Sequence, residues 1–295
     1  MAQILWLSSI TCNGNSHSFL NYPNLDEFLK QHTFLYHPIL PSIYSLKDVF
    51  EQDLSFSVDI LIIEGTLDSS LEKFGKNFES VLLKYALNAR YILTVGTCAT
   101  FGGIFMQKHP NRYGFLYKNS TLHNKFLAFR DKTISISGCP IQAEVLAGVI
   151  DMIDSNLKIH LDEYNRPKEF YGWMVHNGCT RNEYFEYKID NHKFGELEGC
   201  MFYEHGCQAT YTHGSCNKIL WNGVNSKTRA GEPCHGCTEP DFPKDNLWQT
   251  KKHMGIPSTL PFGVPKRVYL SLTGVAKAFK IDRFYKKLLD DKGDS

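Results

Sequence analysis

The feature that most restricts the fold is the alternation of short apolar runs with amphipathic stretches over the first half of the chain. The run Val58–Ile63 (VDILII) is rich in β-branched residues, as in a strand buried on both faces. Similar runs are Ile4–Leu7, Arg90–Gly96 and Thr133–Ser137. Helical patterns follow over residues 26–32, 70–89 and 141–154. This order predicts an α/β fold with a doubly wound parallel sheet.

Three cysteines, Cys12, Cys98 and Cys139, fall just beyond predicted strands. Open α/β sheets bind ligands at the carboxyl ends of their strands, so these thiols, 86 and 41 residues apart, would meet at one edge. Glycines beside them, such as Gly96 and Gly138, would let backbone approach a bulky inorganic group. Three unrelated buried cysteines are the plainer alternative. Their equivalent positions favour a shared site.

From about Arg166 the alternation fades, and Gly, Pro, Asn and aromatic residues increase. We therefore expect two domains, residues 1–165 and 166–295. The second contains the pairs His176-x-x-Cys179 and Cys234-x-x-Cys237, a spacing that lets two ligands bind one centre from a single turn. His176 is preferred over other nearby histidines because it forms such a pair, whereas His17 and His37 are expected at the surface or in turns.

The candidate ligands of the second region divide as four plus three. They are His176, Cys179, Cys200 and Cys207, then Cys216, Cys234 and Cys237. A structural zinc site takes four ligands, so two zinc sites would need eight, one more than the seven candidates here. A set of three thiolates suits a 3Fe–4S cluster, with one ligand per iron. Iron–sulfur is favoured, although spacing alone leaves zinc open.

The composition limits the classes of partner. The net charge of +1 provides no broad attraction to nucleic acid or anionic lipid. No apolar run reaches the roughly 18 residues that a membrane-spanning helix needs, and we expect neither a secretory leader nor a terminal anchor. An odd number of cysteines, nine, indicates metal or catalytic use rather than disulfides. The expected location is the cytoplasm, with peripheral membrane association as a second option.

Taken together, these motifs resemble the small subunit of nickel–iron hydrogenases. Matching pieces occur in order along the chain: ILWLSSITCNGNSHSFLN, IIEGTL, VGTCATFGGI, SGCPIQAE, RPKEFYGWMVHNGC, EGCMFYEHGCQAT, CNKILWN, AGEPCHGCTEPDFP and GVPKRVYLSLTGVAKAF. The resemblance implies a flavodoxin-like domain with a proximal cluster, followed by a largely irregular domain with medial and distal clusters. It also implies a partner large subunit that carries the nickel–iron site, so no catalytic residue is expected in this chain.

The resemblance implies a ligand set for each cluster. Cys12, Cys98 and Cys139 would bind the proximal cluster. The other sets are Cys216, Cys234 and Cys237 for a medial 3Fe–4S cluster, and His176, Cys179, Cys200 and Cys207 for a distal 4Fe–4S cluster. Lys227 lies where many relatives have a fourth medial cysteine. Glu64 matches a family acid near the contact between the two subunits, with a turn or cap role equally open.

Asn15 stands where the family usually has a fourth proximal cysteine. A neutral amide oxygen is a poor ligand for a soft cluster iron. Either the fourth iron is lost, giving a 3Fe–4S cluster, or Asn15, water or another donor keeps it in a non-standard 4Fe–4S cluster. Both outcomes remove a negative thiolate and should raise the reduction potential. A higher potential favours hydrogen uptake.

The leading hypothesis is the electron-transfer subunit of an uptake hydrogenase, resembling the cytosolic group 2 enzymes. Its acceptor would be quinone or a redox protein, and its heterodimers would form a higher oligomer. The alternative is the small subunit of a regulatory H2-sensing hydrogenase that signals to a kinase, although sensors resemble the usual proximal motif more closely. Two further options are a cluster subunit of quinone-reducing respiratory complexes, which lacks the cysteine-rich second region, and a zinc-stabilised binding module.

Overall fold

A computed structural model describes residues 2–52, 54 and 57–244, together with 265, 268, 271, 272 and 275. The matching stretch 263–279 therefore lies almost entirely outside the described residues. Contacts divide the chain into two compact units. The first comprises residues 1–173, 221–223 and 237–243, and the second comprises 174–220, 224–236 and 244–295. The predicted division into domains 1–165 and 166–295 stays a prediction.

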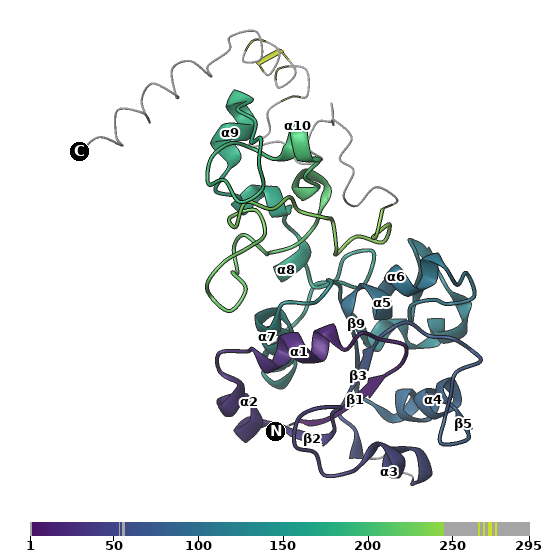
Figure 1. Ribbon diagram of the computed structural model, residues 1–295. Coiled ribbons are helices and arrows are strands. Elements are labelled where there is room, and N and C mark those ends of the chain that lie inside the picture. The colour runs from purple at the N-terminus through teal and green to yellow at the C-terminus, as the bar shows by residue number, and fades with distance from the viewer. Residues whose placement is uncertain are drawn as a thin grey trace. The chain divides into compact units, whose positions relative to one another are not determined.

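The first unit is built on one parallel sheet of five strands in the order β2-β1-β3-β6-β9 (Figure 1). The strands are β1 (Gln3–Ser8), β2 (Thr33–Tyr36), β3 (Ile60–Glu64), β6 (Tyr91–Val95) and β9 (Thr133–Ile136). In order of appearance this is 2-1-3-4-5, the order of the flavodoxin-like fold. The predicted α/β class with a doubly wound parallel sheet is confirmed.

Each face of the sheet carries its own apolar core, because side chains alternate along a strand. Ile4 and Trp6 of β1 pack on one face of the sheet, and Leu5 and Leu7 pack on the other, and helices cover both faces (Figure 1). The first face is covered by α1 (Gly14–Leu20), α2 (Leu25–Gln31) and α7 (Ala143–Asp154). The second is covered by α3 (Leu46–Glu51), α4 (Phe78–Asn88) and η2 (Asn124–Lys132). Burial on both faces explains why the strands read as unbroken apolar runs.

The helix predicted over residues 70–89 is wrong in its first half. Within this range the helix covers only Phe78–Asn88. Asn77 caps its N-terminus, because the Asn77 side chain accepts a hydrogen bond from the Ser80 backbone N–H. Residues before it form a hairpin of β4 (Glu72–Lys73) and β5 (Lys76–Asn77). Phe74 and Gly75 between these strands have φ of +52° and +69°, which a helix does not allow. The edge strand β2 and helix α1 were not predicted.

Shorter elements complete the first unit. They are α5 (Gly96–Phe101), α6 (Gly103–Gln107), the hairpin of β7 (Tyr117–Lys118) and β8 (Thr121–Leu122), and α8 (Lys168–Tyr171). Helices α5 and α6 follow β6 directly and meet at Gly102, whose φ is +97°. A positive φ there breaks the helix.

The part of the second unit that ends at residue 244 is largely irregular, as predicted. Its regular elements are η3 (Val175–Gly178), α9 (Asn182–Tyr187), α10 (Phe202–His205) and η4 (Ala209–Tyr211). Its two small hydrophobic clusters contain Cys200, Cys207 and Cys234, with Cys216 packed against them. So small an apolar core leaves thiols as a main part of the interior.

We expect the buried His37 to make the protein less stable in acid. Its Nδ1 accepts the N–H groups of Ile39 and Leu40, and burial lowers its pKa from 6.5 to about 3. Between those values the unfolded chain binds a proton that the folded chain excludes. The free energy of unfolding should therefore fall as pH falls, by at most about 1.4 kcal/mol per pH unit.

The variant His37→Asn keeps an acceptor near the same place and removes the titration. Its urea midpoint should change less between pH 7 and pH 5 than the wild-type midpoint. The exposed His17 provides the control variant His17→Asn, which should follow the wild type. Equal pH dependence in all three proteins would contradict the assignment.

Candidate metal centres

The three cysteines of the first unit follow three strands of the sheet. Cys12 follows β1, Cys98 lies in α5 after β6, and Cys139 follows β9. The charge of Cys12 acts on Cys98, and a Cβ placed on Gly14 would lie 3.2 Å from Cys12 Sγ and 3.8 Å from Pro140 Cβ. The chain order thus gathers these loops at the carboxyl edge of the sheet, where β1 and β3 form its switch point.

Glu64, the last residue of β3, is completely buried beside this edge. Its Oε1 accepts the backbone N–H groups of Asn15 and Ser16 at 3.1 and 3.3 Å. Its Oε2 accepts from Ser16 Oγ at 2.6 Å and from Trp6 Nε1 at 3.0 Å. These donors offset the cost of burying a carboxylate. Glu64 therefore caps the first turn of α1 from a neighbouring strand, which agrees with the cap role considered for it.

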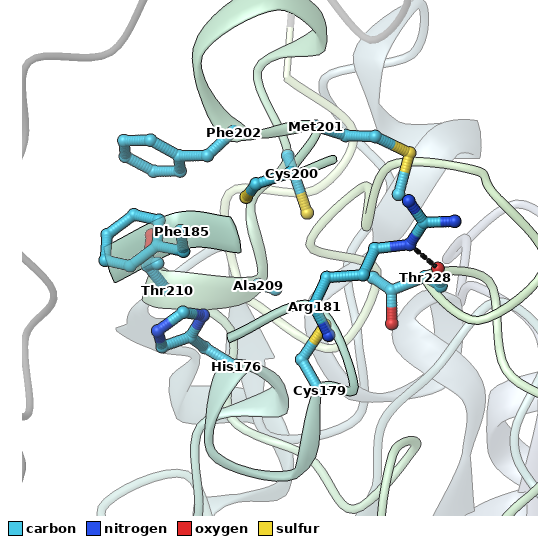
Figure 2. A pocket seen from close by; sticks show the side chains of 11 residues that line it. His176, Cys179, Arg181, Phe185, Cys200, Met201, Phe202, Ala209, Thr210 and Thr228 are labelled. Carbon is cyan, nitrogen blue, oxygen red and sulfur yellow. Dashed lines mark hydrogen bonds between the residues drawn. The ribbon is translucent and has the colours of Figure 1, made fainter. Parts of the chain in front are cut away.

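In the second unit, all four candidate ligands of the distal set line one pocket. His176 and Cys179 come from one turn, Cys200 and Cys207 come from later segments, and Arg181 and Phe185 line the same pocket. Figure 2 shows His176 and Cys179 on one side of the pocket, with Cys200 across from them. His205, His213 and His235, the competing histidines, are not among its lining residues. The structure thus brings the predicted distal ligands together.

The protonation of these side chains follows from their burial. Burial, assisted by the charge of Lys188, lowers the pKa of His176 to about 4, so its imidazole is neutral at pH 7, the form that binds metals. Burial raises the pKa of both Cys200 and Cys207 to about 12. Metal binding would have to release their protons.

Backbone N–H groups surround the candidate thiols. Cys207 Sγ accepts from the Cys234 N–H at 3.2 Å, and Cys179 Sγ accepts from the Arg181 N–H at 3.4 Å. Amides of Ile104 and Phe105, in α6, similarly oppose the rise in the pKa of Cys98, which burial lifts to about 11. N–H groups directed at sulfur are one of the means by which proteins stabilise and tune iron–sulfur clusters. The donor set therefore fits such clusters.

Arg181 is a functional candidate that sequence reasoning missed. Its side chain is buried, and its guanidinium donates to the backbone carbonyls of Glu196, Glu198, Gly199 and Thr228 (Figure 2 shows the last of these). Within the part of the chain that the structure describes, no carboxylate forms an ion pair with it. A fixed positive charge suits a pocket that holds a negatively charged cluster. Nothing in the residue spacing singles Arg181 out.

The three candidate medial ligands fall in different parts of the chain. Cys216 and Cys234 belong to the second unit, and Cys237 belongs to the first. Within the first unit, Thr97 Oγ1 donates to the Cys237 carbonyl and accepts from the Gly138 N–H. Thr97 thus connects Cys237 with the loops that carry Cys98 and Cys139.

A single zinc ion and an iron–sulfur cluster make different demands on the spacing of their ligands. Zinc holds its donors at about 2.0–2.3 Å around one point. Among the described residues, no three His, Cys, Asp or Glu side chains are grouped closely enough to hold one metal ion. A cluster of several irons instead spreads its bonds to the protein over separate metal atoms.

Comparison with known families agrees with this chemistry. A family model for the C-terminal part of the NiFe/NiFeSe hydrogenase small subunit matches residues 171–248, and one for the NADH ubiquinone oxidoreductase 20 kDa subunit matches residues 12–153. The chain is 33% identical to periplasmic [NiFe] hydrogenase small subunit 1 of Nitratidesulfovibrio vulgaris over 81% of its length and 78% of the relative. The chain belongs to the small subunits of nickel–iron hydrogenases.

Other relatives of this small subunit support the same assignment. It is 25% identical to the uptake hydrogenase small subunit of Azotobacter vinelandii, over 89% of this chain and 75% of that protein. The [NiFeSe] hydrogenase structure from Desulfovibrio vulgaris Hildenborough matches with a TM-score of 0.67 and 26% identity, covering 85% and 98% of the two chains. Small subunits of this family bind iron–sulfur clusters. No helix in the described part of the chain is long and apolar enough to cross a membrane.

We expect Arg181→Met to destabilise the small subunit. Methionine fills much of the volume but leaves several buried carbonyls without a donor, which should cost about 3 kcal/mol or more. The control is Arg229→Met, because Arg229 is only half-buried and has one long bond, 3.5 Å, to the Asn217 carbonyl. Thermal unfolding should show a clear drop in the midpoint for Arg181→Met alone. Similar midpoints for the two variants would contradict the role assigned to Arg181.

Proposed function

We propose that this small subunit is the electron-transfer subunit of an uptake nickel–iron hydrogenase. It would relay electrons from H2 oxidation on a partner large subunit, through three iron–sulfur clusters, to an acceptor such as quinone. The observation that carries the proposal is the single pocket lined by His176, Cys179, Cys200 and Cys207. One neutral imidazole and three buried or half-buried thiols around one pocket are a donor set that suits a multi-nuclear iron–sulfur centre.

The proposed clusters follow the ligand sets of the sequence analysis. Cys12, Cys98 and Cys139 hold the proximal cluster, and His176 with Cys179, Cys200 and Cys207 holds a distal 4Fe–4S cluster. Cys216, Cys234 and Cys237 hold a medial 3Fe–4S cluster. When bound, such clusters accept and release electrons one at a time.

The chain's own residues prepare these sites. Backbone N–H groups face Cys98, Cys179 and Cys207, and the Arg181 guanidinium adds positive charge at the distal pocket. Both features stabilise added negative charge. Within the first unit, the Thr97 hydrogen bond joins the residue before Cys98 to Cys237, one of the proposed medial ligands.

The uptake direction rests on the proximal site. A site with three thiolates carries one negative charge fewer than a site with four, and net charge is one determinant of cluster potential. A higher potential makes the cluster a ready acceptor of electrons from hydrogen and a weak donor in the reverse direction. The similarity to an uptake hydrogenase small subunit supports this direction.

The proposal includes a nickel–iron large subunit as the obligatory partner. It also includes quinone or a redox protein as the acceptor, and further association of the heterodimers. The cytoplasm, with peripheral membrane association as an option, stays the predicted location.

The first test is spectroscopic. The complex, purified without oxygen, should contain roughly ten iron atoms per small subunit with a similar amount of acid-labile sulfide, as three clusters require. Its oxidised 3Fe–4S EPR signals should disappear on reduction with hydrogen. Zinc without acid-labile sulfide would overturn the proposal, and tight kinase binding with slow turnover would favour the H2-sensing alternative.

A ligand variant tests the distal site separately. Cys200→Ser should abolish or shift the reduced distal 4Fe–4S signal and leave the oxidised 3Fe–4S signals unchanged. Met201 lines the same pocket without being a proposed ligand, so Met201→Leu is the control. An unchanged distal signal in Cys200→Ser would remove Cys200 from the ligand set.

A further inference from the structure

Asn15 is buried, with 7% of its surface exposed, and both ends of its side-chain amide are engaged by the backbone. Its Oδ1 accepts from the Ile141 N–H at 3.0 Å, and its Nδ2 donates to the Val95 carbonyl at 3.3 Å. Its own backbone N–H donates to Glu64 Oε1. The orientation of the amide is therefore set by protein groups.

The side-chain hydrogen bonds of Asn15 reach the segments next to the other two proximal cysteines. Ile141 follows Cys139 by two residues, Val95 precedes Cys98 by three, and Asn15 itself follows Cys12 by three. One side chain thus connects the loops that carry all three proximal cysteines. The Cys98 and Cys139 loops are also joined by the hydrogen bonds between Thr97 and Gly138, but only the Asn15 side chain bonds to both of them from the Cys12 loop among the described residues.

The space around the amide is closed on one side by Gly96. A Cβ added to Gly96 would overlap Asn15 Nδ2 and lie 2.9 Å from Oδ1. The φ of Gly96, +87°, is also one that glycine adopts readily and other residues do not. Glycine at this position lets the amide reach the end of β6, so the local backbone is shaped to receive Asn15.

The three thiols differ from Asn15 in exposure. Cys12 and Cys139 are exposed and Cys98 is partly exposed, whereas Asn15 faces the interior. A neutral amide is also a weak donor to a soft iron. Its hydrogen bonds to Ile141 and Val95 give the amide a complete role without a metal.

We propose that Asn15 is a positioning residue and not an iron ligand. It ties the proximal loops together by hydrogen bonds, and the cluster type at this site is set by Cys12, Cys98 and Cys139 alone. This inference rests on the proposed function, because it assumes that these cysteines hold a cluster. It deepens that function by separating two roles, binding iron and holding the loops in place, that a fourth cysteine at position 15 would combine.

The test compares Asn15→Ala with the wild type in the complete hydrogenase complex. The oxidised EPR spectrum should integrate to the same number of 3Fe–4S clusters, because no ligand is removed. The unfolding temperature should fall by about 5 °C through the loss of two buried hydrogen bonds. The proximal cluster should be lost to an iron chelator roughly tenfold faster, while the distal cluster is lost at the wild-type rate. The exposed Asn21, which bonds to the His17 carbonyl, provides the control Asn21→Ala.

The opposite result is equally clear. An additional 3Fe–4S signal, present in Asn15→Ala and absent from the wild type, would show that Asn15 held a fourth iron at the proximal site. That result would overturn the proposal. If Asn15→Ala fails to assemble, Asn15→Asp decides. Aspartate keeps the acceptor for Ile141 but opposes the Val95 carbonyl, so we expect a lowered unfolding temperature and an unchanged proximal signal. If Asn15→Asp instead unfolds at the wild-type temperature and its proximal cluster has a lower reduction potential, position 15 is a ligand and the proposal is wrong. Absence of iron and sulfide from the wild type would instead overturn the proposed function.

Discussion

The buried carboxylate of Glu64 is the interaction on which the proximal site depends. It ends β3 at the switch point of the sheet and binds the first N–H groups of α1, so it fixes where the chain goes after Cys12. Trp6 and Ser8 of β1 and the Ser16 hydroxyl of α1 also donate to this carboxylate. Without these donors a carboxylate would not be tolerated at such a depth. The same contacts set the position of Asn15.

The second unit solves a different physical problem. In its part that ends at residue 244, short helices and turns bury little apolar surface, and thiols form much of the interior. The Arg181 guanidinium compensates in part by collecting carbonyls from two irregular segments, 196–199 and Thr228. An interior built from metal-binding side chains and the buried Arg181 is stable mainly when a metal centre is bound to those side chains. Folding of this unit and binding of metal are therefore expected to be coupled.

The sequence patterns predicted the sheet well because each inner strand is buried on both faces. Such strands read as continuous apolar runs, and Val58–Ile63 is the clearest of them. The edge strand β2 (Thr33–Tyr36) was not predicted, because only the two middle residues of its four are buried. The sequence pattern predicts helix at the hairpin Glu72–Asn77 because its residues continue the apolar spacing of α4. The positive φ values at Phe74 and Gly75 leave little trace in that spacing.

The sequence alone determined the class of fold, the position of each candidate thiol after a strand or within a short turn, and the family. These follow from periodicity and motif order, which are local properties of the chain. The tertiary structure decided which groups meet: the four distal donors in one pocket, the carbonyls around Arg181, and the partners of Glu64 and Asn15. Asn15 bonds to residues 80 and 126 positions away. No local pattern records such a contact, because it depends on how parallel strands far apart in the chain are ordered within one sheet.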